Sequence, residues 1–160
     1  MRRTRAGAMS LGALLLAAQF WQPERTNPPV DPAASLDQHV TVPADVAAIL
    51  ERSCRDCHTN ETRWPPYAYL SPFSWAVASH VQQGRDHLNF SEWGLEDPES
   101  MQDLLEEICE EVRDGTMPLP SYTIVHRSAR LAPAEVTRLC SWTDETIAAL
   151  DGRRTRADSE

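Results

Sequence analysis

Residues 54–58 are Cys-Arg-Asp-Cys-His, and this pentapeptide decides how the rest of the chain is interpreted. Two cysteines three positions apart at a helix end present both sulfur atoms to the same side. Each thiol can add across a vinyl group of haem, and the histidine that follows then lies beneath the ring, where it can bind iron. The motif therefore predicts one covalent haem c on Cys54 and Cys57, with His58 as the proximal iron ligand.

Three other kinds of site use similar residues. A zinc site needs four ligands, usually from a second pair, and the sequence has no second C-x-x-C and no H-x-x-x-H. A thioredoxin-like dithiol needs a βαβ setting, which the helical pattern does not offer. A disulfide between Cys54 and Cys57 is the simplest alternative, since export favours disulfides. The motif favours haem over all three.

The spacing of apolar residues predicts four amphipathic helices and no run of strands, so the fold class is all-α. The helices are expected over residues 44–56, 72–83, 98–113 and 133–150. Capping residues support these bounds: Gly84 and Gly152 are expected stops, and Asp97, Pro98 and Gly115 bracket the third helix. Four short helices give a modest core, and a large flat apolar cofactor would complete it.

The distal iron ligand is assigned to Met117, within the sequence Gly-Thr-Met-Pro-Leu-Pro of residues 115–120. Prolines stiffen this loop and would hold the thioether in place, and Met/His ligation raises the reduction potential of haem. Packing in the core is the other use for such a methionine. Among the histidines, His80 shares a helical face with apolar residues and is the alternative distal ligand.

Two further cysteines, Cys109 and Cys140, lie on the apolar faces of the third and fourth helices. They are either two small buried hydrophobic residues or a disulfide formed in an oxidising compartment. Aromatic residues are expected to wall the haem, and Arg85 or Tyr67 are candidates to meet its propionates. These aromatic residues are Trp64, Trp75, Trp93 and Trp142.

The N-terminal residues 1–21 carry arginines followed by an apolar run over residues 6–21, the pattern of an export signal or a short membrane anchor. A Pro-rich linker is expected over residues 22–43, the haem-binding domain over 44–151 and a polar tail over 152–160. The protein is therefore expected in the periplasm or another extracytoplasmic space, anchored to the cytoplasmic membrane if the segment is not cleaved.

The charge of the chain is unevenly distributed. Because three arginines are the only charges before Glu24, residues 21–160 hold 12 of the 15 arginines and all 24 acidic residues, a formal charge of −12. Nucleic acid is not expected as a partner for so acidic a domain, because its phosphates would be repelled. A basic redox protein is a suitable partner; the alternative is an acidic surface that serves solubility alone.

Four blocks of sequence between Arg25 and about Trp142 carry a resemblance to a known family. They are RTNPP at 25–29, CRDCHTNETRWPPYAYLSPFSW at 54–75, HLNFSEW at 87–93 and GTMPLPSY at 115–122. In these blocks the chain resembles the bacterial haem-binding domain family, single-haem proteins related to cytochrome c, whose members carry an N-terminal hydrophobic segment.

This resemblance implies a small cytochrome c-like helical domain wrapped around one covalent haem. It implies thioether bonds at Cys54 and Cys57 and axial ligation by His58 and Met117. The chain departs from a small cytochrome c in the long insert between the motif and the methionine, which carries two helices and His80. The expected function is a single-haem electron carrier rather than an enzyme. The alternative is a haem enzyme or a gas or redox sensor with a displaceable distal ligand.

Overall fold

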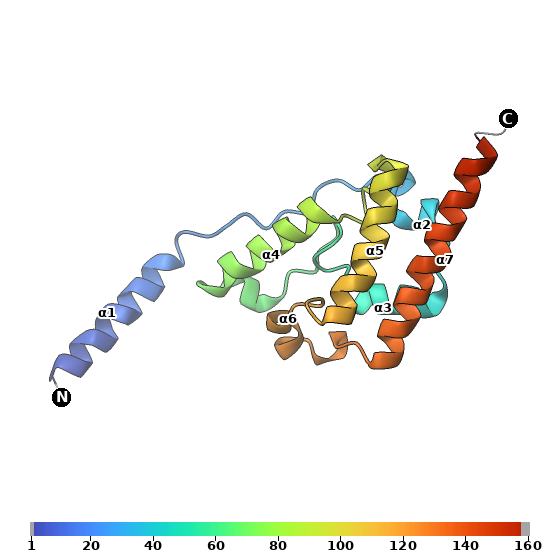
Figure 1. The fold of residues 1–160 in the computed structure, drawn as a ribbon. Helices are drawn as coiled ribbons and strands as arrows, with labels where there is room; N and C mark the ends of the chain where they lie inside the picture. The colour runs from blue at the N-terminus through green and yellow to red at the C-terminus, as the bar shows by residue number, and fades with distance from the viewer. Residues whose placement is uncertain (1, 158–160) are drawn as a thin grey trace.

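A computed structural model describes residues 2–157, together with all side chains in that range except those of residues 2–6, 8, 156 and 157. The described chain is all-α, as predicted, and no strand occurs in it (Figure 1). The α-helices are α1 (Arg2–Ala18), α2 (Leu36–His39), α3 (Ala44–Ser53), α4 (Phe73–His87), α5 (Pro98–Asp114), α6 (Pro120–Val125) and α7 (Pro133–Ala157). Short 3₁₀ helices lie between them: η1 (Pro32–Ala34), η2 (Pro66–Tyr69), η3 (Trp93–Leu95) and η4 (Arg127–Ala129).

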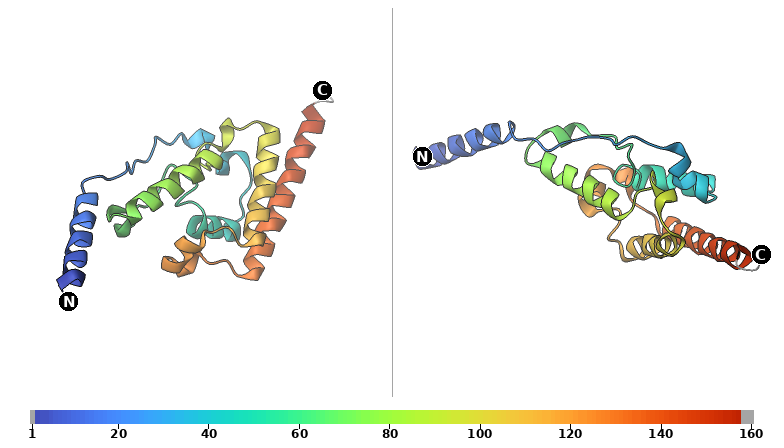
Figure 2. Two further views of the ribbon diagram at one scale, coloured as in Figure 1. Left: turned by 60° about the vertical axis from the view of Figure 1, so that its left-hand side comes forward. Right: turned by 90° about the horizontal axis from the view of Figure 1, so that it is seen from above.

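Helices α5 and α7 form the main helix pair of the domain. They run antiparallel and lie side by side in every view (Figures 1 and 2). Leu105 and Leu139 are completely buried in the core that the two helices share. A disulfide joins Cys109 to Cys140 across this interface, with 4.8 Å between the Cα atoms. Of the two states that the sequence left open for these cysteines, the structure has the disulfide.

The third layer of the core comes from α3 and from residues that precede it. Val46, Ile49 and Leu50 on one face of α3 are buried, as their helical spacing predicts. Leu36 and Val40 are buried in the same cluster, although both lie inside the expected linker. The backbone N–H of Leu36 also donates to the carbonyl of Phe90 at 2.8 Å. The second half of the Pro-rich stretch is therefore part of the folded domain.

Helix ends follow local chemistry in some places and not in others. Asp97 accepts hydrogen bonds from the backbone of the first turn of α5, and Gly115 ends that helix with a left-handed φ of 74°. The prediction that the last helix stops before Gly152 was wrong, because α7 continues to Ala157. A glycine inside a helix costs only about 1 kcal/mol. Arg153, which follows Gly152 in this extension of α7, donates from its side chain to the carbonyl of His39 at 3.4 Å.

Helix α1 lies apart from the other helices and is joined to them near the start of α4 (Figures 1 and 2). Most of its apolar side chains with a described exposure are exposed. None of the helices within residues 2–157 has both the length and the apolar character needed to cross a bilayer.

We expect the Cys109–Cys140 disulfide to be a major source of stability, because it closes a loop of 31 residues between two helices that pack on each other. The double substitution Cys109→Ala and Cys140→Ala should lower the free energy of unfolding by about 3 to 4 kcal/mol, measured by urea denaturation. A reductant should lower the stability of the natural chain by a similar amount and leave the variant unchanged. A midpoint that neither treatment moves would contradict this role.

Candidate functional site

The Cys-x-x-Cys-His motif forms a turn that directly follows α3. The helix ends at Ser53, earlier than predicted, and Cys54 caps it. The backbone N–H groups of Cys57 and His58 both donate to the carbonyl of Cys54, at 3.1 Å. Cys54 and Cys57 are free thiols, and both are half-buried. The structure thus brings two unpaired thiols and one imidazole together within five residues.

The imidazole of His58 is held in one orientation by the end of α4. Its Nδ1 lies 3.1 Å from the carbonyl oxygen of Gly84 and 3.0 Å from that of Leu88. Because both partners are acceptors, Nδ1 must carry the proton and donate it, which leaves the lone pair on Nε2. Burial lowers the pKa of His58, so the ring is neutral at neutral pH. A neutral imidazole with its second nitrogen free is the form that binds a metal.

Gly84 allows α4 to approach the motif closely. A Cβ atom at this position would lie 2.8 Å from the carbonyl oxygen of Cys57, too close for any side chain. The prediction that this glycine stops the helix was wrong, since α4 continues to His87. Its role is close packing instead. The backbone N–H of Phe90 then donates to the carbonyl of His58 at 2.8 Å, which ties the chain after α4 to the same turn.

Arg85, the next residue of α4, braces the segment that follows the motif. Its guanidinium donates to the carbonyl of Thr59 and the hydroxyl of Thr62, both at 2.8 Å. It also donates to the carbonyl of Thr26 at 2.9 Å and the side-chain oxygen of Asn27 at 2.8 Å. These four acceptors give the side chain of Arg85 a structural role, and its expected contact with a haem propionate stays a prediction.

Two adjoining cavities surround the motif, with volumes of about 330 Å³ and 180 Å³. The larger volume is in the range of small-molecule sites in proteins, which begins near 300 Å³. Both cavities are lined by Cys54, His58, His87 and Met117. Apolar side chains make up much of the remaining lining, namely Leu88, Phe90, Leu104, Ile108, Val112, Pro118 and Leu119.

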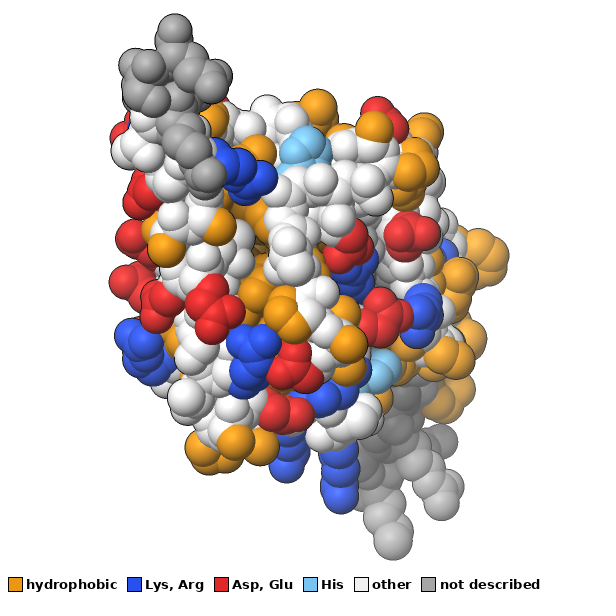
Figure 3. All heavy atoms as spheres, turned by 90° about the vertical axis from the view of Figure 1, so that its right-hand side faces the viewer, with side chains coloured by type: hydrophobic (Ala, Val, Ile, Leu, Met, Phe, Trp, Pro, Cys, Tyr) orange, Lys and Arg blue, Asp and Glu red, His pale blue; other side chains and the backbone are white. Residues whose placement is uncertain are grey.

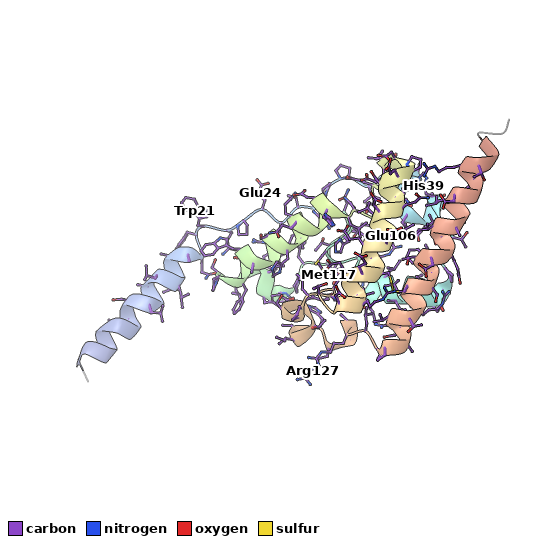
Figure 4. All side chains as sticks on the ribbon, viewed as in Figure 1. Trp21, Glu24, His39, Glu106, Met117 and Arg127 are labelled. Carbon is purple, nitrogen blue, oxygen red and sulfur yellow. A yellow bond between two sulfur atoms is a disulfide. The ribbon has the colours of Figure 1, made fainter. Side chains whose placement is uncertain are left out.

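Met117 lies near the centre of the domain, between α5 and α6 (Figure 4). Its side chain is half-buried and packs against the core, and its backbone N–H donates to the carbonyl of Glu111 at 3.1 Å. His80 lines only the larger cavity. His87, whose side chain is exposed, pairs with Glu107 at 2.8 Å. The structure thus brings both candidate distal ligands, Met117 and His80, to the cavity that Cys54, Cys57 and His58 line.

Tyr122 belongs to the site but was not singled out from the sequence. Its ring lines the larger cavity, and its hydroxyl donates to the carboxylate of Asp56 at 2.7 Å. The ring also stacks on His126, with 4.3 Å between centroids. Burial and the neighbouring Asp56 raise the pKa of Tyr122. The hydrogen bond ties the loop after Met117 to the interior of the motif.

The expectation that tryptophans wall the site was wrong. Trp93 and Trp142 are completely buried in the core, and no tryptophan lines either cavity in the described chain. Phe90 and Tyr122 supply the aromatic walls. The other propionate candidate, Tyr67, bonds through its hydroxyl to Nε2 of His126 at 2.8 Å.

The chemistry of the thiols differs from that of a redox dithiol. Burial raises the pKa of Cys54 to about 12 and that of Cys57 to about 11. Redox-active C-x-x-C pairs instead have a lowered thiol pKa. Zinc is equally disfavoured, because no group of three or more His, Cys, Asp or Glu side chains among the described residues is placed to hold a bare metal ion.

A family model described as the haem-binding domain matches residues 13–145. The chain belongs to the haem-binding domain family. The matched region begins inside α1 and ends inside α7, so it includes the Pro-rich stretch as well as the helical domain. Comparison with curated proteins and with solved structures finds no match. The chain is therefore a haem-binding protein, and the matched region contains the residues that line both cavities.

The residues around the cavities fit a haem. The donor set combines a neutral imidazole, a thioether and two free thiols, which are the groups that ligate or attach haem. Apolar side chains line much of the space, as a flat apolar ring requires. Ser53 also lines the larger cavity, and its buried hydroxyl has no hydrogen-bond partner among the described residues.

We expect Gly84→Ala to destabilise this haem-binding protein by about 1 to 3 kcal/mol, because the methyl group collides with the backbone of Cys57. Helix propensity alone predicts the opposite sign, a gain of up to about 1 kcal/mol. Urea unfolding measures the difference. Gln82→Ala, at an exposed position of the same helix, is the control and should change stability little. A more stable Gly84→Ala variant would show that α4 does not hold the motif closely.

Proposed function

We propose that this haem-binding protein is a single-haem electron carrier of the c type. Cys54 and Cys57 would form the thioether bonds, His58 would bind the iron on one side and Met117 on the other. The observation that carries the proposal is the convergence of these four residues on one cavity, with the imidazole already oriented by two backbone carbonyls. A bound haem supplies a one-electron ferric–ferrous couple.

Each side chain at the site has a task in this proposal. The carbonyls of Gly84 and Leu88 fix the ring of His58 and increase its basicity as a ligand. A thioether at the second axial position favours the ferrous state and so raises the reduction potential. Apolar walls such as Phe90 and Ile108 exclude water from the cofactor and lower the local dielectric. These are the properties that an electron carrier requires.

Electron transfer is favoured over catalysis because both axial positions have a candidate side chain on the cavity. If His58 and Met117 both bound the iron of a haem held here, no position would stay open for a substrate or a gas. An enzyme or sensor would instead need Met117 to leave. The loop around Met117 is restrained by the Tyr122–Asp56 hydrogen bond and by the core contacts of the methionine, and both restraints oppose its departure.

The proposed location is the outer side of the cytoplasmic membrane or the periplasm. The basic and apolar N-terminal segment supports this, as does the disulfide, which persists in oxidising compartments. A basic redox protein is the proposed partner. Figure 3 shows Asp and Glu side chains spread over the side of the domain where α7 lies, and such a surface would speed encounter with a positive partner at low salt.

Covalent attachment is tested first. The chain is produced in a bacterium whose envelope contains the machinery that attaches haem c. It should then carry one haem per molecule, measured as a mass increase of one haem and by the pyridine haemochrome spectrum. The double substitution Cys54→Ser and Cys57→Ser should lose the covalent haem and leave a less stable protein, because the cofactor completes the core. Cys109→Ala with Cys140→Ala is the matched control and should retain haem. Colourless protein with four intact cysteines would contradict the proposal.

The distal ligand is tested by Met117→Ala. Loss of the thioether should remove the methionine–ferric charge-transfer band and lower the reduction potential by on the order of 100 mV, since axial ligands span about 0.8 V. Met101→Ala, which removes a half-buried methionine of α5 that lines neither cavity, is the control.

His80→Ala completes this test. If Met117→Ala leaves the spectrum unchanged while His80→Ala alters it, the distal ligand is the histidine. Rapid carbon monoxide binding by the unmodified ferrous protein would instead indicate an open or displaceable site, and so an enzyme or sensor.

A further inference from the structure

Most of the large apolar side chains that the domain leaves exposed lie at one end, where α1 joins it. Phe20 is 94% exposed, Trp21 80% and Phe73 61%. Together with Tyr69, Leu70 and Trp75 they form a group that we call the collar, made from the turn that follows α1 and from the η2–α4 segment. Apart from those of α1, the described chain exposes few such side chains outside the collar, namely Val30, Leu95, Ile124 and Val125.

The collar is built around a hydrogen-bonded joint between α1 and α4. Ser71, just before α4, donates through its hydroxyl to the carbonyl of Ala18 at 3.0 Å and accepts from the Gln22 amide at 2.8 Å. The indole N–H of Trp75 donates to the carbonyl of Trp21 at 3.0 Å. The exposed side chains of α1 and of the η2–α4 segment therefore belong to one connected surface.

This end of the molecule differs from the rest in the sign of its net charge. Residues 1–30 hold four arginines and one acidic residue, Glu24, whereas residues 31–160 hold 11 arginines and 23 acidic residues. At the collar itself, the guanidinium of Arg25 lies 4.5 Å above the ring of Tyr69. An anionic surface would attract the apolar, basic end and repel the acidic remainder.

We propose that the collar is a lipid-facing surface that seats the domain on an anionic bilayer at the level of the headgroups. Tyr and Trp side chains favour that level because they are apolar with one polar group. Exposed Leu11, Leu14 and Leu16 of α1 take up lipid contacts beyond it. This deepens the membrane location in the proposed function: the bilayer holds the domain by two elements, α1 and the η2–α4 segment, and so in a fixed orientation.

Helix α4 then sets the distance between lipid and haem. It begins in the collar at Phe73, and Gly84 contacts Cys57 eleven residues later. At 1.5 Å per residue, this places the attachment motif about 16 Å from the collar along the helix axis.

Photolabelling tests the contact directly. The full-length haem-loaded chain is bound to vesicles of phosphatidylcholine and phosphatidylglycerol that contain a phospholipid with a photoactivatable group near the headgroup. Labelled residues are mapped by mass spectrometry. We expect adducts on residues 66–75 as well as on α1, and none above background at Leu95 or Ile124, which are exposed apolar residues outside the collar. Adducts on α1 alone would overturn the proposal.

Partitioning gives an independent result. Leu70→Ser with Phe73→Ser removes two collar side chains and leaves the Ser71 and Trp75 hydrogen bonds intact. Co-sedimentation with the same vesicles should fall about tenfold for this variant, and less than about twofold for the control Leu95→Ser with Ile124→Ser. Equal losses in the two variants would overturn the proposal, as would a collar-dependent dimer in lipid-free solution that does not bind vesicles. Haem content is measured on the same samples. A chain that is photolabelled in the collar but carries no covalent haem would contradict the proposed function and leave the lipid contact of the collar supported.

Discussion

The contact between the end of α4 and the turn after α3 is the constraint on which the site depends. Two backbone carbonyls of α4 and the residue after it accept from one imidazole nitrogen, and the missing side chain of Gly84 lets the two segments meet. Backbone groups inside regular structure move less than side chains, so the ring of His58 has one orientation and one tautomer before any cofactor is bound. The segment between the motif and Met117, which contains α4, supplies this support.

Features that depend on neighbouring residues could be predicted from the sequence. The bounds of α5 follow from Asp97, Pro98 and Gly115, because a cap acts within one turn of its own helix. The buried face of α3 follows from the spacing of Val46, Ile49 and Leu50. The grouping of cysteines and histidine in residues 54–58 needs no tertiary information at all. The all-α class and the candidate attachment residues therefore rest on local chemistry.

Features that depend on distant residues could not be predicted. Leu36 is buried because Phe90 and the rest of the core pack against it. The Pro-rich sequence around Leu36 does not indicate this contact. Tyr122 and Asp56 are 66 positions apart, so their hydrogen bond has no sequence spacing to reveal it. Arg85 was a plausible partner for an anion by type alone, yet four acceptors from distant segments engage its guanidinium. In each case packing between elements decides the outcome.

The disulfide between α5 and α7 also divides the four sulfur atoms of the chain into two classes. Cys109 and Cys140 are buried and already oxidised, so neither can be alkylated until that bond is broken, and burial shields the bond from attack by another thiolate. Cys54 and Cys57 keep their hydrogens and line a cavity. An electrophile that enters the molecule therefore finds two free thiols rather than four. The helix pair thus confers chemical selectivity on a site to which it contributes no thiol.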